Sequence, residues 1–208
     1  MSKAAIKSPW AAERAARSEV ESRKKEAILE VAAVTFVKYG FHGTTMDMIA
    51  EVLDVSKPTI YKHYKNKAEL LHACNERAHN RFMPLALECR DLDGTALDKI
   101  KHYQYRSVEF FTDELGRALA LIEETGLDPE GRRHWQELRE KIADIFRNII
   151  REGIKKKEIN PNVDPKLALL AIFGAFNAIA TWFNPEGKYT AEQVCDKYFE
   201  VFLNGLKP

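Results

Sequence analysis

Side chains that bind nucleic acids are concentrated in a short segment between positions 57 and 63. Within seven residues the segment offers hydrogen-bond donors, two cations and an aromatic ring, the groups that contact base edges and phosphate oxygens. These side chains belong to Lys57, Thr59, Tyr61, Lys62 and His63. Residues 1–67 carry 12 Lys and Arg against 8 Asp and Glu, whereas residues 68–208 carry 20 against 23. The positive part of the chain is therefore the one expected to contact a polyanion.

Catalytic or metal chemistry has little support in the sequence. Glu76 and His79 form a Glu-x-x-His pair with His72 on the same helical face, so a metal is conceivable. A di-iron site of the ferritin type needs a second such pair and two more glutamates, and the sequence has no second pair. The three cysteines are widely spaced, and no Gly-rich phosphate loop or nucleophile elbow occurs. We therefore expect no enzyme, no metal and no cofactor.

The spacing of apolar residues predicts an all-α fold of about nine helices. Apolar residues recur at helical intervals almost everywhere, and no stretch alternates with the period of two that a half-buried strand needs. Gly40 is expected to end the first long helix in a left-handed conformation, and Pro84 to kink or end a later one. Helix starts are predicted from capping residues at Ser56, Asn66, Thr95, Thr112, Asp164 and Thr190.

Two very short helices are expected on either side of a tight turn at positions 53–56. The first contains Ile49 and Ala50, and the second runs from Lys57 to about His63. Helices of under ~12 residues are marginal in water, so both must pack on the apolar stripe of the preceding helix, which leaves the polar side of segment 57–63 free. Phosphate-binding groups at helix N-termini are expected from Thr44, Thr45 and Lys67.

The stretch from Arg23 to Leu71 resembles the DNA-binding domain of the TetR (tetracycline-repressor) family. The resemblance implies a dimer of helix-turn-helix units on a palindromic DNA operator, controlled by a small-molecule effector bound in the C-terminal domain. It departs from the family at Leu53-Asp54, where Ala-Gly is common, and aspartate tolerates the left-handed conformation that the turn needs. The matching residues are Ile28, Ala32, Phe36, Gly40, Thr44, Thr45, Ile49-Ala50, Val55-Ser56, Thr59-Ile60-Tyr61, Tyr64, Lys67 and Leu70-Leu71.

We expect the chain to divide into three parts, which are a weakly ordered arm at 1–17, a DNA-binding domain at 18–67 and a ligand-binding and dimerisation domain at 68–208. Aromatic side chains of the C-terminal part are candidates to line a ligand cavity, although such residues at helical spacing more often form core. The candidates are Phe110, Phe111, Trp135, Phe146 and Trp182. The last two helices pack against their symmetry mates in the family, with small residues such as Gly174 permitting close approach. The dimer interface is thus predicted at Ala168, Ile172, Ala175, Phe176, Ile179, Tyr198, Val201 and Phe202.

The ending from Trp182 to Leu206 is similar to the C-terminal segments of TetR regulators of fatty-acid or steroid breakdown. That resemblance implies an amphipathic effector, such as an acyl-coenzyme A (acyl-CoA). The apolar run Leu167–Phe183 is shorter than the ~20 residues of a membrane span, and no signal-peptide core precedes it, so we expect a cytoplasmic protein with no membrane contact. A helical, dimeric interaction module without DNA binding is the alternative.

Overall fold

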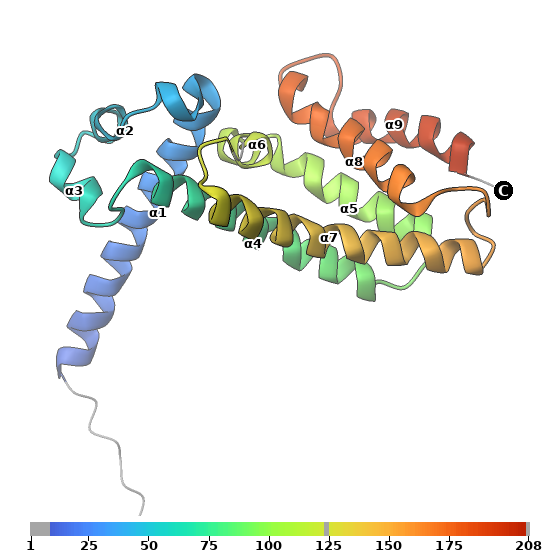
Figure 1. Ribbon diagram of the computed structural model, residues 1–208, viewed down its shortest axis with the longest axis horizontal. Coiled ribbons are helices and arrows are strands. Elements are labelled where there is room, and N and C mark those ends of the chain that lie inside the picture. Colours follow the sequence, from blue (N-terminus) through green and yellow to red (C-terminus); the bar gives the residue numbers. More distant parts are fainter. Residues whose placement is uncertain (1–8, 123–124, 207–208) are drawn as a thin grey trace, which may run out of the picture.

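Helices make up all the regular structure of the residues described by the computed structural model, 9–122 and 125–206 (Figure 1). No strand occurs in these two ranges, which confirms the all-α prediction. The helices are α1 (Pro9–Gly43), α2 (Met46–Val52), α3 (Lys57–Tyr61), α4 (Lys67–Asp91), α5 (Ala96–Phe110), α6 (Glu114–Leu121), α7 (Pro129–Lys155), α8 (Pro165–Trp182) and α9 (Ala191–Leu206).

Capping side chains begin the helices largely where the sequence predicts. The Asn66 side chain accepts a hydrogen bond from the backbone N–H of Glu69 at 2.8 Å, which starts α4. Reciprocal capping boxes pair Thr95 with Asp98 at α5 and Thr190 with Gln193 before α9. Thr112 does not cap α6. The following Asp113 does so, with its carboxylate accepting from the Gly116 N–H at 2.6 Å.

Positive backbone φ angles occur at two expected bends. Gly40 has a φ of 69° inside α1, which kinks there and continues to Gly43. Asp54 has a φ of 51° in the turn between α2 and α3, so aspartate does adopt the left-handed conformation. α4 continues through Pro84 to Asp91 and does not end at the proline.

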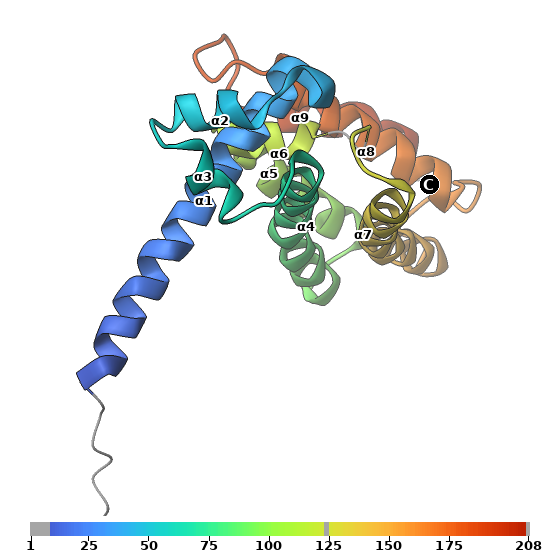
Figure 2. The ribbon, with the colours of Figure 1, turned by 60° about the vertical axis from the view of Figure 1, so that its left-hand side comes forward.

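α1 begins inside the segment predicted as a weakly ordered arm. α1 begins at Pro9, so residues 9–17 are helical, and residues 1–8 lie outside the described part of the chain. Figure 2 shows the first turns of α1 projecting away from the rest of the molecule, and residues 13–20 are all exposed. The Arg23 guanidinium pairs with Glu19 one turn earlier at 2.6 Å in this part of α1, the i,i+4 spacing that stabilises exposed helices.

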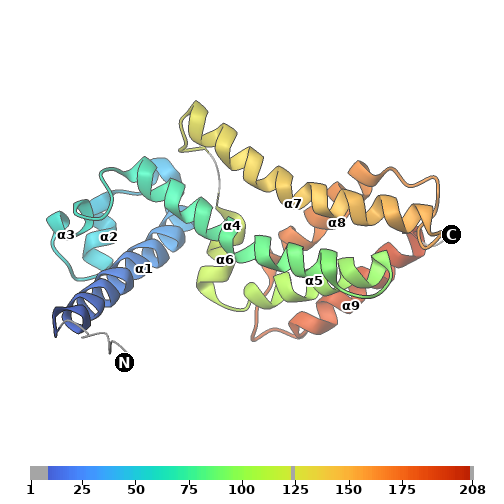
Figure 3. The same cartoon turned by 90° about the horizontal axis from the view of Figure 1, so that it is seen from below.

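Two hydrophobic clusters are joined by α4. The first cluster gathers α1–α3, the start of α4 and parts of α6 and α7 around Phe36, Ile49 and Ile60. The second gathers the end of α4 with α5 and α7–α9 around Phe146 and Phe176. Seen from below, α4 leads from the group of α1–α3 into the bundle (Figure 3). A shift of α4 would therefore disturb both clusters.

α8 is the one helix of the described residues that could cross a membrane by length and composition alone. Ile172, Phe176 and Ile179 on its inner side are at most 1% exposed and belong to the second cluster. The Phe176 ring lies 5.2 Å from the ring of Phe199 on α9. α8 is thus a core helix with one covered and one open side.

Candidate DNA interface and ligand cavity

α3 is held with one side inward by a single fully buried residue. Ile60 is 0% exposed and packs in the first cluster, while Pro58 occupies the first turn, where its missing N–H has no cost. Ser56 lies at the N-cap position as predicted, but its side chain makes no capping hydrogen bond to the backbone, and its hydroxyl lies 2.9 Å from that of Thr59 instead. α3 ends at Tyr61, which makes it two residues shorter than predicted.

The outer side of α3 presents one aromatic ring and two lysines. Tyr61 is 42% exposed. The Lys57 ammonium lies 2.7 Å from Asp47 on α2, and the hydrogen bond between them raises the pKa of Lys57. The Lys62 ammonium lies 2.7 Å from Glu21 on α1, and its hydrogen bond lowers the pKa of that carboxyl. Both lysines are held in place by accessible carboxylates that phosphate oxygens could replace.

Two predicted DNA contacts are wrong, because their side chains point into the protein. Thr44 is 0% exposed, and its hydroxyl donates to the backbone oxygens of Gly40 at 2.8 Å and Thr35 at 3.2 Å, which closes the kinked end of α1. The His63 side chain is 3% exposed, because His63 lies three residues after the buried Ile60 and residues at that spacing share one face of a helix.

Thr45 and Lys67 also have structural partners, although both stay partly accessible. Thr45 is exposed, and its hydroxyl caps α2 by accepting from the Met48 N–H at 3.2 Å. The Lys67 ammonium donates to the backbone oxygens of Phe41 at 2.5 Å and Thr44 at 2.7 Å, and it lies 4.3 Å from the centre of the Phe41 ring. Lys67 thus joins the start of α4 to the end of α1, and a phosphate contact by it stays a prediction.

A cavity of ≈ 790 Å³ lies among α4, α5, α6, α7 and α8. Its inner wall is mainly apolar and includes Phe82, Leu119 and Phe173. Its rim is charged, with four cations and two carboxylates among the lining residues. These rim residues are Arg133, Arg139, Arg147, Lys166, Glu137 and Glu140. An amphipathic anion matches this distribution, because its hydrocarbon part can enter while its charged part stays at the rim.

Only one of the five aromatic residues predicted for the ligand site, Trp135, lines the cavity. Phe111 and Phe146 are at most 1% exposed and pack in the second cluster. Phe110 packs on Phe82 with the Arg81 guanidinium 4.2 Å above its ring, and Trp182 is 49% exposed on the outer side of α8. Phe111 and Phe146 fill the core, as aromatic residues at helical spacing often do, whereas Phe110 packs at its edge and Trp182 faces outward.

The predicted dimer interface needs a similar correction. Ile172, Phe176 and Ile179 are buried inside their own protomer, so they cannot form the surface that meets a second copy. Val201 on α9 is 71% exposed, whereas Ala168, Ala175, Tyr198 and Phe202 are half-buried. The open side of α8 is mainly apolar and carries Leu167, Leu170, Ala171, Gly174, Ala178 and Trp182. A Cβ atom added at Gly174 would meet nothing within 4 Å, so this surface is not covered by the protomer itself.

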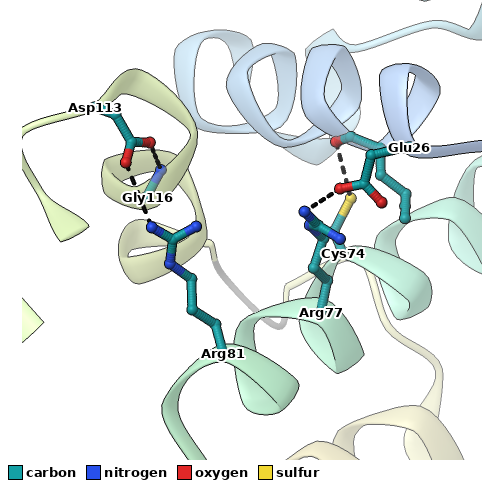
Figure 4. A network of polar contacts seen from close by, with 7 residues as sticks. Glu26, Cys74, Arg77, Arg81, Asp113 and Gly116 are labelled. Atoms are coloured by element: carbon teal, nitrogen blue, oxygen red, sulfur yellow. Dashed lines mark hydrogen bonds and ion pairs between the residues drawn. The ribbon is translucent and has the colours of Figure 1, made fainter. Parts of the chain in front are cut away.

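Two arginines on α4 connect the two parts of the molecule (Figure 4). Arg77 pairs with Glu26 on α1, beside the buried Cys74, whose pKa burial raises to about 12. Arg81, one helical turn later, reaches Asp113 at 3.4 Å, the residue that caps α6. The intervening part of α4 also lines the cavity through Ala78 and His79. A ligand in the cavity thus contacts the same turn of α4 that is bound to α1.

Comparison with known proteins identifies the class to which this fold and these surfaces belong. Residues 28–74 match the model of the bacterial regulatory proteins of the tetR family, and residues 93–206 match that of the tetracyclin repressor-like C-terminal domain. The chain therefore belongs to the TetR family of bacterial regulatory proteins. It is a helix-turn-helix transcriptional regulator and not an enzyme.

Several relatives resemble the chain over most of its length. The HTH-type transcriptional regulator RutR of Escherichia coli (strain K12) is 39% identical, over 92% of this chain and 94% of its own length. The fatty acid metabolism regulator protein of Bacillus subtilis (strain 168) is 26% identical, over 86% and 93%. The solved structure of AibR in complex with isovaleryl coenzyme A and operator DNA shares the fold, with a TM-score of 0.76 and 24% identity over 86% of this chain and 97% of its own.

Proposed function

We propose that this protein is a dimeric repressor in the cytoplasm that binds a palindromic DNA operator through α3 and releases it when an acyl-CoA binds the C-terminal cavity. The observation that carries the DNA part is the outer side of α3 and the residue after it, where Tyr61, Lys57 and Lys62 are exposed and the two lysines pair only with accessible carboxylates. A helix of this size fits the major groove of B-DNA, and helix-turn-helix proteins dock in that way.

The second copy is proposed to cover the open side of α8. A row of small and apolar residues along a helix lets two backbones approach closely, and Gly174 lies in the middle of that row. A two-fold dimer places two recognition helices on two half-sites, which gives the operator its palindromic symmetry. The DNA-binding domain is proposed at residues 18–67 and the ligand-binding and dimerisation domain at 68–208.

The effector class rests on the division of the cavity into an apolar interior and a cationic rim. The acyl chain would fill the interior, and the phosphates of coenzyme A would meet Arg133, Arg139 and Lys166. AibR, which shares this fold, was crystallised with isovaleryl coenzyme A, and the Bacillus subtilis relative is named for fatty acid metabolism. Both names support a ligand of this chemistry.

The test combines DNA binding with ligand titration. Fluorescence anisotropy with a duplex carrying the palindrome upstream of the gene should show tight binding, and a long-chain acyl-CoA should release the duplex. The same ligand should raise the melting temperature, because a ligand that binds only the folded state stabilises it. Absence of a thermal shift across a panel of acyl chain lengths would contradict the proposal that the effector is an acyl-CoA. Absence of duplex binding would contradict the proposed binding of this operator.

A further inference from the structure

The first turns of α1 extend beyond the helices that follow it. Among the residues described, Ile28 is the first buried one of this helix, and residues 10 and 13–20 are all exposed. At about 1.5 Å per residue, segment 9–20 is roughly 18 Å long. Figures 1 and 2 show this segment, the α1 extension, projecting beyond α2 and α3. Its exposed side chains are therefore placed to contact a second molecule.

One side of the α1 extension is continuous with the side of α1 that meets the end of α3. Glu21 marks this side, because its carboxylate lies 2.7 Å from the ammonium of Lys62, the residue after α3. Residues four and seven positions earlier share the same side of a helix, which places Arg17 and Arg14 there. Trp10, one turn before Arg14, continues the row and is 67% exposed. A duplex that contacts α3 can therefore reach these three side chains as well.

The two arginines of this row are free to bind an anion. Neither guanidinium forms an ion pair or hydrogen bond with any residue of the described ranges. By contrast, Glu19 and Arg23 each lie two positions from Glu21, on the opposite side of α1, and pair with each other at 2.6 Å. Glu13, the other carboxylate of the extension, lies at the edge of the row. Guanidinium groups bind phosphate oxygens through paired hydrogen bonds, and B-DNA carries one negative charge per about 1.7 Å of its axis. The charge of this row thus complements a DNA backbone.

We propose that the α1 extension is a second DNA-binding element, in which Arg14 and Arg17 bind phosphates of the backbone beside the half-site that α3 reads. This inference rests on the proposed function, since α3 must place the duplex next to the extension. The indole N–H of Trp10 offers a further donor to the same backbone. Phosphates are alike at every base pair, so these contacts add affinity without sequence preference, unlike a base contact by Tyr61.

Fluorescence anisotropy with the full-length protein tests this element on two duplexes of equal length, the operator and a scrambled sequence. Arg14→Ala and Arg17→Ala should each flatten the slope of log affinity against log salt by about 1.8, because a dimer loses two phosphate contacts. Each variant should weaken binding to both duplexes by the same factor, about tenfold at roughly 100 mM salt. Arg23→Ala is the matched control, since it removes the same charge from the opposite side of α1 and should change affinity by less than about twofold.

The outcomes separate this inference from the proposed function. Wild-type slopes and affinities in both Arg14→Ala and Arg17→Ala would overturn the inference and leave DNA binding by α3 standing. No retained duplex with the wild-type protein would instead overturn the proposed function, and this inference with it. Loss of affinity for the operator alone would show that the arginines read bases, and a lower mass of the variants in light scattering would show that the row binds a second copy. Either result would overturn the assignment to the DNA backbone. The melting temperature should stay unchanged, because both side chains are exposed.

Discussion

The recognition helix α3 and the core helix α8 differ in how firmly their sequences specify an outer side. α3 has one apolar residue that can be buried, Ile60, so its polar residues must face outward. α8 is apolar around most of its circumference, so composition does not distinguish the side that packs in the protomer from the side left open. The comparison teaches that sparse apolar residues orient a helix better than abundant ones.

The largest expected effect is on the covered side of α8. Phe176→Ala should lower the free energy of unfolding by about 3–5 kcal/mol, because a fully buried ring is lost and a cavity remains. Urea denaturation followed by circular dichroism measures the change. An effect below about 1 kcal/mol would place Phe176 outside the core and reverse the distinction between the two sides.

A substitution on the open side of α8 should weaken the dimer without unfolding the protomer. Gly174→Leu should leave the protomer folded, because the added atoms meet open space, but it should dissociate the dimer by overpacking the surface between the two copies. The expected loss is about 1–3 kcal/mol for each substituted protomer. Light scattering coupled to size exclusion gives the mass. A dimer that persists at micromolar concentration would show that the copies meet elsewhere.

Removing the outward groups of α3 should abolish specific DNA binding without unfolding the protein. Tyr61→Ala and Lys57→Ala should each cost about 1–3 kcal/mol per half-site, measured by anisotropy with the operator duplex. Lys155→Ala is the control, because Lys155 is an exposed lysine at the far end of α7. Unchanged affinity in both α3 variants would exclude α3 as the DNA-reading element.

The smallest expected effect concerns the connection between the two regions. Arg77→Ala should cost about 1 kcal/mol in stability, because the pair with Glu26 is partly exposed. Duplex affinity without ligand should persist, whereas release by acyl-CoA should weaken, since α4 is no longer joined to α1 by this pair. Arg90→Ala removes an exposed ion pair from the same helix and is the control. Equal release in both variants would show that Arg77 does not transmit the signal.

Features encoded by a few neighbouring residues could be predicted from the sequence. The caps at Asn66, Thr95 and Thr190 and the left-handed Asp54 follow from local chemistry, and the structure contains all of them. The outward position of Tyr61 follows from the burial of Ile60, although its contact with DNA stays a prediction.

Features decided by distant packing could not be predicted in this way. Thr44 is buried because the kink at Gly40 turns the end of α1 over it. The inward position of His63, three residues after the buried Ile60, follows by contrast from helical spacing. The cavity combines residues from five helices, so side chains such as Phe82 and Arg133 carry no local signal that they line one cavity. Burial in α8 depends on which neighbours α5, α6, α7 and α9 provide.

The most direct test of the account is the salt dependence of duplex affinity for the wild-type protein. If Lys57 and Lys62 of both protomers replace their carboxylate partners with DNA phosphates, the logarithm of the affinity should fall linearly with the logarithm of salt concentration. Four such contacts alone predict a slope of about −3.6, or roughly a 150-fold loss between about 50 and 200 mM salt. No retained duplex at the lowest salt concentration, or an affinity that does not change with salt, would contradict the account.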